Sequence, residues 1–293
     1  MAELTGKVAL VAGATRGAGR GIAEALGEKG ATVYISGRST RSGQSEMGRP
    51  ETIEETAERV VKRGGVAIAV RTDHRDREQI KSLMEQIQRD HGRIDILVND
   101  IWGGEKLTHW NKPFWETPLE DALKLQQTVL ETHYMTAYFA APLLLNSEDA
   151  LIAEITDGTD YRYRGNLPYS LAKAWGIHMG HGLAEEWKAK GVTAVSLTPG
   201  FLRSEEMLDY FGVTEANWRD AGEREVHFLQ SETPLFVGRA LACLAADPGK
   251  LELSGRALSS WELSDRYGFV DDDGRRPHWG RYFETLETPP TVT

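Results

Sequence analysis

Two residues four positions apart carry the clearest chemical signal in this sequence. In the run Tyr169-x-x-x-Lys173 the phenol and the ammonium are one helical turn apart, so in a helix both side chains lie on the same face. A free tyrosine has a pKa of about 10, which is too high for efficient proton transfer near neutral pH. A neighbouring ammonium favours the phenolate and lowers that pKa. The pair predicts a tyrosine acid/base tuned by a lysine, although the same spacing also occurs in ordinary exposed pairs.

A glycine-rich turn near the N-terminus predicts a nucleotide site. The apolar run Val8–Ala12 is followed by Gly13-x-x-x-Gly17-x-Gly19 and then by a helical pattern. Glycines allow a tight turn and a close backbone approach to a pyrophosphate, and the first N–H groups of the helix bind the anion. The positions expected to contact the nucleotide in this turn are Gly13, Thr15, Arg16, Gly17, Ala18 and Gly19.

The end of the second predicted strand indicates which nucleotide binds. A site for NAD(H) places an acidic residue there, where it binds the ribose 2′-hydroxyl. This chain has Ser36-Gly37-Arg38-Ser39 instead, and the nearest carboxylate is Glu46. Arg38 and Arg16 together form a charged fork suited to a 2′-phosphate, unless both are merely solvated surface arginines. We therefore expect NADP(H) rather than NAD(H).

The elements that position these residues alternate between short apolar runs and helical patterns. The predicted strands are Val8–Ala12, Thr32–Ser36, Val66–Arg71, Ile94–Val98, Ala150–Thr156 and Thr193–Thr198. The predicted helices are Ala18–Lys29, Glu51–Arg63, Asp76–Asp90, Leu119–Leu145 and Tyr169–Lys190. This alternation predicts an α/β fold, a Rossmann-type doubly wound parallel sheet covered by helices on both faces. With no repeat or break in composition, we expect a single domain with a core of about residues 5–260 and a C-terminal extension of about 261–293.

Three stretches interrupt this compact pattern. Ser39–Pro50 is a polar insertion, whereas Ile101–Pro118 and Phe201–Thr233 each carry four or more aromatic side chains. The last two follow predicted strands at their carboxyl ends, where doubly wound folds bind ligands. Aromatic residues in long loops also pack locally, so each one has that alternative. We expect a small substrate that is apolar or aromatic.

Composition excludes several classes of partner. The formal net charge of the 293 residues is -10, which opposes nucleic-acid binding. The single cysteine, Cys243, fits a reducing compartment. The first residues lack the pattern of a secretory leader, and the apolar runs are too short to span a bilayer. These observations predict a cytoplasmic protein with no membrane partner.

Several motifs in order resemble one enzyme family. Gly13-x-x-x-Gly17-x-Gly19, Asp73, Asn99, Tyr169-x-x-x-Lys173 and Pro199-Gly200 have the order and contexts found in short-chain dehydrogenases/reductases. The resemblance covers roughly residues 5–260. More narrowly, the runs Lys112–Pro118, Leu253–Arg256, Asp265–Gly268 and Asp273–Arg275 resemble the branch called dehydrogenase/reductase SDR family member 1.

The resemblance implies hydride transfer between a nicotinamide and a carbonyl or alcohol substrate. In its terms, Tyr169 is the acid/base, and Lys173 binds the ribose and tunes Tyr169. Pro199-Gly200 borders the nicotinamide, Asn99 supports the cofactor face and Asp73 the adenine. The family associates through its two long helices, so a homodimer or homotetramer is expected. The extension after Gly255 either covers a neighbouring subunit or closes over the substrate.

Two positions depart from the family pattern. The serine usually found thirteen residues before the tyrosine is replaced by Thr156, whose hydroxyl can donate the same hydrogen bond to a substrate carbonyl. We favour Thr156 as a catalytic residue over its neighbour Asp157, because an ionised carboxylate opposes a developing alkoxide. The usual helix asparagine of the proton relay aligns with Val129, and Gln127 or His133 are the candidate replacements.

Two further interpretations follow from these departures and from the histidines. His178 and His181 lie three apart on the predicted Tyr169 helix, but no third ligand has a matching spacing, so we expect no metal. The departures also leave room for a nucleotide-binding regulatory or scaffold protein with little catalysis. Intact Tyr169 and Lys173 favour the enzyme.

Overall fold

A seven-stranded parallel sheet forms the centre of the molecule. The structure is a computed structural model that describes residues 3–287. The strand order is β3-β2-β1-β4-β5-β6-β7, with every neighbouring pair parallel. The strands are β1 Val8–Ala12, β2 Thr32–Gly37, β3 Val66–Arg71, β4 Ile96–Asn99, β5 Leu151–Ile155, β6 Thr193–Thr198 and β7 Ala257–Ser259. This arrangement confirms the predicted doubly wound fold and adds β7, which we did not predict.

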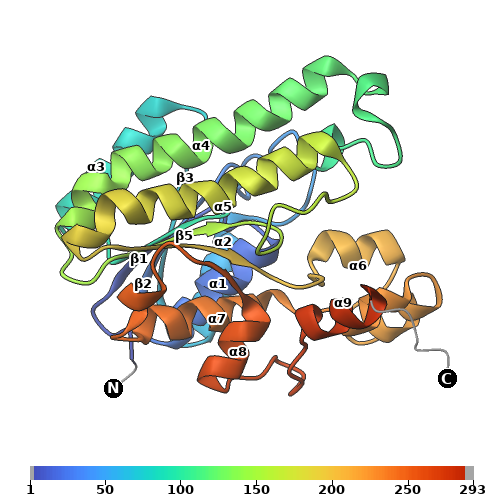
Figure 1. Ribbon diagram of the computed structural model, residues 1–293. Coiled ribbons are helices and arrows are strands. Elements are labelled where there is room, and N and C mark those ends of the chain that lie inside the picture. The colour runs from blue at the N-terminus through green and yellow to red at the C-terminus, as the bar shows by residue number, and fades with distance from the viewer. Residues whose placement is uncertain (1–2, 288–293) are drawn as a thin grey trace.

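Helices cover both faces of the sheet (Figure 1). The helices are α1 Gly17–Glu28, α2 Ile53–Lys62, α3 Arg77–Asp90, α4 Leu119–Leu145, α5 Leu167–Trp187, α6 Glu205–Phe211, α7 Pro234–Ala246, α8 Ser260–Tyr267 and α9 Trp279–Glu287. One apolar core lies between the sheet and α1, α2, α7 and α8. A second core lies between the opposite face and α3, α4 and α5. Strands β1, β4, β5 and β6 are buried along their whole length, as expected for parallel strands covered on both faces.

Local sequence explains where the site-bearing helix begins. The Asn166 side chain accepts a hydrogen bond from the Tyr169 N–H (3.0 Å) and caps α5. Pro168 lies in the first turn of α5, where its missing N–H costs nothing. α5 therefore starts two residues before Tyr169, which places Tyr169 and Lys173 on its first two turns.

The aromatic stretch after β6 divides into packed and cavity-facing residues. Phe211, Trp218 and Phe228 are buried together in a small apolar cluster, so local packing accounts for these three.

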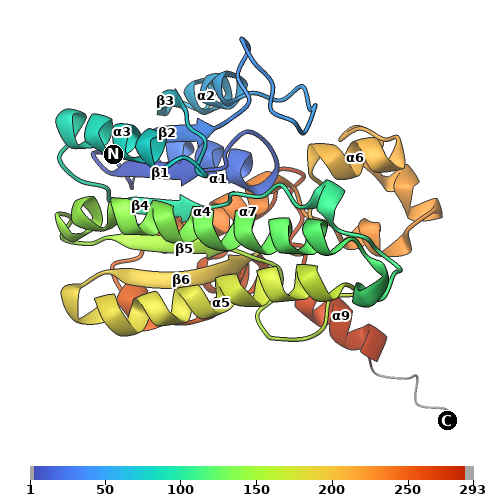
Figure 2. The ribbon, with the colours of Figure 1, turned by 90° about the horizontal axis from the view of Figure 1, so that it is seen from above.

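α6 and α9 lie beyond one end of the sheet, on the side where the loops after the strands gather (Figure 2). No helix within residues 3–287 is both long and apolar enough to cross a membrane.

Candidate active site

A cavity of about 1170 Å³ opens at the carboxyl ends of the strands. Loops after β1, β2, β3, β4, β5 and β6 all contribute to its lining. Its volume exceeds the usual range for drug-sized ligands, about 300–1,000 Å³, and so has room for a dinucleotide and a substrate. The predicted site residues that line it are Gly13, Thr15, Arg16, Gly17, Ala18, Arg38, Asp73, Thr156, Tyr169, Lys173, Pro199 and Gly200.

The glycine turn is shaped by its contact with the end of β4. Gly13 has a φ of 90°, and a Cβ there would lie 2.2 Å from the carbonyl oxygen of Asp100. A Cβ on Gly19 would lie 2.7 Å from the carbonyl oxygen of Gly13, and the Gly19 N–H donates to the Asp100 carboxylate. Burial raises the pKa of Asp100 to about 7. These contacts require glycine at both positions and leave a backbone cradle that fits a dinucleotide.

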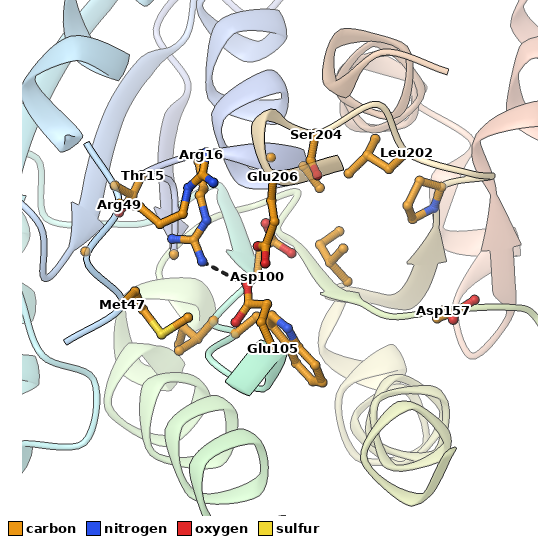
Figure 3. A pocket seen from close by; sticks show the side chains of 18 of the residues that line it. Thr15, Arg16, Met47, Arg49, Asp100, Glu105, Asp157, Leu202, Ser204 and Glu206 are labelled. Carbon is orange, nitrogen blue, oxygen red and sulfur yellow. Dashed lines mark hydrogen bonds and ion pairs between the residues drawn. The ribbon is translucent and has the colours of Figure 1, made fainter. Parts of the chain in front are cut away.

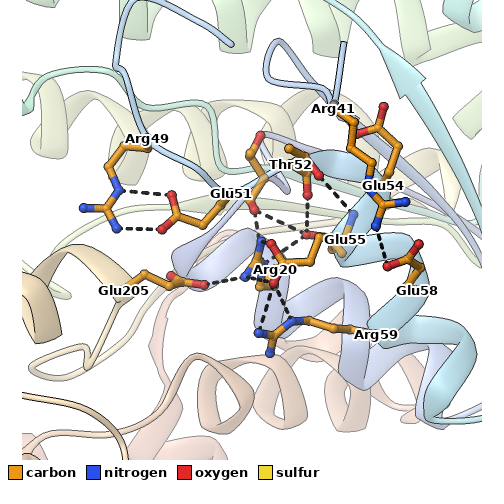
Figure 4. A network of polar contacts seen from close by, with 12 residues as sticks. Arg20, Arg41, Arg49, Glu51, Thr52, Glu54, Glu55, Glu58, Arg59 and Glu205 are labelled. Carbon is orange, nitrogen blue, oxygen red and sulfur yellow. Dashed lines mark hydrogen bonds and ion pairs between the residues drawn. The ribbon is translucent and has the colours of Figure 1, made fainter. Parts of the chain in front are cut away.

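Carboxylates hold the groups expected to face the cofactor phosphates. The Gly17 N–H donates to Oε2 of Glu205 on α6 (2.8 Å), and the same carboxylate pairs with Arg20 (3.0 Å; Figure 4). Arg16 pairs with Glu105 at 2.9 Å, and Glu206 lies on the other side of Glu105 (Figure 3). A bound pyrophosphate would therefore compete with Glu205 and Glu105 for these donors.

Arginines are more numerous in this cavity than the sequence analysis recognised. Arg38 pairs with Glu46 at 2.5 Å, and its hydrogen bond lowers the pKa of Glu46 to about 2. Arg75 joins Glu46 (3.1 Å) to Asp73 (2.7 Å). Arg49, which contacts Asp209 of α6 at 2.8 Å, also lines the cavity. We missed Arg49 and Arg75 because they lie in or after irregular segments with no motif spacing.

Tyr169 and Lys173 lie together against two tryptophans. The Tyr169 ring meets Trp102 edge-on, with centroids 5.6 Å apart, and meets Trp110 at 5.1 Å. The Lys173 Nζ lies 3.8 Å from the centre of the Trp102 ring and 5.4 Å from that of Tyr169. Burial lowers the pKa of Lys173. Burial and the adjacent Asp157 raise the pKa of Tyr169 well above its usual value, so the phenol is protonated in this arrangement.

Asp157, rather than Thr156, contacts the phenol. The Thr156 hydroxyl donates to the backbone carbonyl of Lys173 (2.6 Å), and the side chain is almost fully buried. The Tyr169 hydroxyl donates to Oδ2 of Asp157 at 2.8 Å. Thr156, which we expected to face the substrate carbonyl, thus has its hydroxyl turned toward the backbone of α5, while Asp157 is the partner of the phenol.

Neither candidate replacement for the family asparagine faces Tyr169. Val129 is buried beside Leu125 and Ala172. His133 contacts Glu154 through Nδ1 (2.6 Å) and the carbonyl of Ile101 through Nε2 (3.0 Å). Gln127 donates to Glu131 on the exposed side of α4. Gln127 and His133 therefore both have structural partners of their own.

Asn99 and Gly19 are the two predicted site residues that do not line the cavity. The contacts of Gly19 are those of the glycine turn described above. The Asn99 side chain is fully buried and donates to Oε1 of Glu154 at 2.7 Å. The same Glu154 carboxylate contacts His133. This cluster ties the end of β4 to β5 and α4, so Asn99 supports the cavity wall from behind.

The C-terminal extension closes over the Pro199-Gly200 turn of the same chain. Trp279 lines the cavity and packs edge-on against Phe201, with ring centroids 5.8 Å apart. A Cβ on Gly200 would lie 2.7 Å from Cβ of Trp279. The Gly200 N–H donates to Glu232 (2.9 Å), whose pKa burial raises to about 8. Neither Trp279 nor Glu232 belongs to a recognised motif, so the sequence did not indicate either residue.

Within residues 3–287 no group of three or more His, Cys, Asp or Glu side chains is arranged to hold a metal ion. His178 and His181 lie with ring centroids 6.3 Å apart on α5.

Comparisons with known proteins point to one enzyme family. Residues 7–211 match the family model for short chain dehydrogenase. The chain is 35% identical over 280 residues to "Dehydrogenase/reductase SDR family member 1" of Mus musculus, covering 94% of this chain and 86% of that protein. It is 29% identical to a 7alpha-hydroxysteroid dehydrogenase of Clostridium sardiniense over 84% of this chain and 89% of that one.

Solved structures share the fold at low sequence identity. A short chain dehydrogenase from Mycobacterium thermoresistibile superposes with a TM-score of 0.77 at 21% identity, covering 94% of this chain and 92% of that one. An NAD(P) dependent gluconate 5-dehydrogenase from Beutenbergia cavernae, solved with bound NADP, gives a TM-score of 0.70 at 22% identity, over 88% of this chain and 96% of that one. The fold, the glycine turn, the Tyr-x-x-x-Lys helix and the extended match at 35% identity together show that this chain belongs to the short-chain dehydrogenase/reductase family.

Proposed function

We propose that this protein transfers a hydride between NADP(H) and a small carbonyl or alcohol substrate, with Tyr169 as the acid/base. One observation carries the proposal. Tyr169 and Lys173 line the same cavity as the glycine turn, at the carboxyl ends of the strands. A nicotinamide dinucleotide supplies or accepts the hydride when it is bound.

The chain's own residues divide the remaining work. The glycine turn and Arg16 hold the phosphates, and Asp73 lies where the adenine is expected. Lys173 binds the nicotinamide ribose and favours proton release from Tyr169. Thr156 fixes the second turn of α5 through the Lys173 carbonyl (2.6 Å), which makes it a positioning residue in this proposal.

The charge around the end of β2 supports NADP(H) over NAD(H). Arg38 and Arg75 both line the cavity there, and Glu46 bridges them from the polar insertion. Arginine forks bind phosphate groups well. A 2′-phosphate would take the place of the Glu46 carboxylate between the two guanidinium groups.

The substrate end of the cavity supports an apolar or aromatic substrate. Relatives at the sequence level include a hydroxysteroid dehydrogenase and a hydroxynaphthalene reductase. Aromatic rings give large apolar contact areas with few rotatable bonds. The aromatic residues that line this cavity, besides Tyr169, are Trp102, Trp110, Phe201, Tyr210 and Trp279.

Exposed apolar side chains on the two long helices support a homodimer or homotetramer. Large exposed apolar patches commonly mark protein interfaces. The exposed large apolar residues of α4 and α5 are Leu119, Leu123, Leu130, Tyr134, Tyr138, Leu145, Leu167 and Leu171. Replacing Leu130 and Tyr138 with glutamate should convert the assembly to monomers in light-scattering measurements.

A substrate panel tests the proposed activity. Purified protein with NADPH is offered aldehydes, ketones and quinones, and with NADP⁺ it is offered the corresponding alcohols. Tyr169→Phe should lose turnover by about a hundredfold or more, the usual contribution of general acid–base catalysis. Tyr163→Phe is the matched control, because Tyr163 is exposed on the loop before α5. If nothing is turned over while NADPH still binds, a regulatory nucleotide-binding role replaces the enzyme.

A further inference from the structure

We propose that Asp157 takes the proton from Tyr169 during alcohol oxidation and passes it to solvent. The proposal rests on the proposed function, since Tyr169 must be the acid/base. In this proposal Asp157 takes over the proton-relay role of the family asparagine. Val129, which aligns with that asparagine, has only an apolar side chain and is buried in an apolar cluster.

The geometry places a solvent-exposed carboxylate beside a partly buried phenol. Trp102 and Trp110 pack on the Tyr169 ring, and the hydroxyl donates to Oδ2 of Asp157 at 2.8 Å. The Asp157 side chain keeps 44% of its accessible surface and lines the cavity. A proton that reaches Asp157 therefore has a direct path to solvent.

The charges facing Asp157 suit a group that gains and loses a proton. Lys173 of α5 and Arg164 of the loop before α5 (3.9 Å from Oδ1) bring positive charge to it. The backbone carbonyl of Asp160 holds Arg164 in place at 2.8 Å. Asp100 and Glu105, from the segment after β4, act on Lys173. The two cations balance the ionised carboxylate, so it stays beside the phenol.

The proton path balances in the oxidation direction. The alcohol O–H proton moves to Tyr169 Oη while the phenol's own proton moves to Asp157 Oδ2. The substrate C–H bond breaks, its electron pair leaves as hydride to the oxidised nicotinamide, and a C=O bond forms. Asp157 then releases its proton to water. An ionised carboxylate is the required acceptor.

Reduction needs the opposite protonation state. If Asp157 is ionised when Tyr169 protonates the substrate, a phenolate is left 2.8 Å from a carboxylate, which like-charge repulsion opposes. Asp157 must therefore carry a proton before reduction begins. The rate of reduction should therefore fall as the pH rises.

Asp157→Asn tests the proposal because it keeps the shape and removes the proton acceptor. Asp160→Asn is the matched control, since that carboxylate lies on the same loop and contacts Arg164 instead of the phenol. The first readout needs no substrate: the ultraviolet absorbance change of Tyr169 ionisation, isolated by subtracting Tyr169→Phe. In Asp157→Asn the phenol should ionise at a lower pH than in the parent, while Asp160→Asn should match the parent.

The second readout is the pH profile of kcat/KM in both directions. The parent's reduction rate should fall as the pH rises, and Asp157→Asn should lose that slope while its rate drops about a hundredfold in both directions. Asp157→Ser, which offers a hydroxyl but no comparable proton acceptor, should show the same loss and guards against misfolding of the asparagine variant. Unchanged Tyr169 ionisation and an unchanged pH slope in both variants would overturn the relay. If Tyr169→Phe also retained turnover, the proposed function itself would fail, so the two failures are distinguishable.

Discussion

Replacing Glu46 with glutamine should tighten NADPH binding and leave NADH binding unchanged. Glu46 occupies the position proposed for the 2′-phosphate, with contacts of 2.5 and 2.6 Å to Arg38 and 3.1 Å to Arg75. A phosphate must break these contacts before it can form its own. The substitution removes the competing negative charge and leaves both arginines available.

The expected change in NADPH affinity on Glu46→Gln follows from the exposure of the Glu46 side chain. More than half of the Glu46 side-chain surface is accessible, and exposed ion pairs contribute only about 0.2–1 kcal/mol each. Two such pairs give roughly 1 kcal/mol, or about a fivefold lower Kd for NADPH. Arg38→Ala works in the opposite direction, because losing a charge-assisted hydrogen bond costs about 1.5–3 kcal/mol, a tenfold to hundredfold rise in Kd.

Calorimetric titration with NADPH and with NADH measures both effects on one preparation. Glu58→Gln is the matched control, since Glu58 of α2 forms a similar exposed ion pair with Arg41. The reasoning fails if Glu46→Gln and Arg38→Ala both leave the Kd of NADPH unchanged. It also fails if the parent binds NADH more tightly than NADPH.

Three further changes have expected outcomes. Lys173→Ala should weaken NADPH binding and lower turnover together, whereas an effect on turnover alone would contradict a ribose contact; titration and steady-state kinetics measure the two. Glu205→Gln should lower the Kd of NADPH severalfold by freeing the Gly17 N–H from a carboxylate (2.8 Å), and an unchanged Kd would show that phosphates bind elsewhere. Burial raises the pKa of Glu232 from 4.5 to about 8, so its neutral form stabilises the fold below pH about 4.5, and that stability is lost as pH rises toward about 8. Glu232→Gln should therefore unfold at a higher denaturant concentration than the parent above pH about 8 but not near pH 5, and equal pH dependence of both proteins would contradict this.

Periodicity predicted the central sheet because its strands are uniformly apolar and its helices are long. β1, β3, β6 and α4 have the bounds that the sequence indicates. β7 escaped prediction because three residues are too few for a period, and only its pairing with β6 identifies it. α9 also escaped prediction, because its position over the cavity depends on a tertiary contact, the packing of Trp279 against Phe201.

The nucleotide motif and Tyr169-x-x-x-Lys173 were readable because backbone geometry ties them to fixed spacings. The side chain that faces the substrate was not, since a shift of one residue after β5 decides between Thr156 and Asp157. Electrostatics alone favoured Thr156. In the structure the Thr156 hydroxyl contacts the Lys173 carbonyl and Asp157 contacts the phenol, and neither contact was indicated by a motif spacing.

Deuterium transfer from 4-deuterated NADPH to a carbonyl substrate tests most directly whether Tyr169 drives hydride chemistry in this cavity. Mass spectrometry of the product measures the transfer in the parent and in Tyr169→Phe. The parent should place one deuterium in each product molecule. Tyr169→Phe should bind NADPH with the same Kd and transfer deuterium at least about a hundredfold more slowly. Transfer at the parent's rate by Tyr169→Phe would contradict the assignment of Tyr169 as the acid/base.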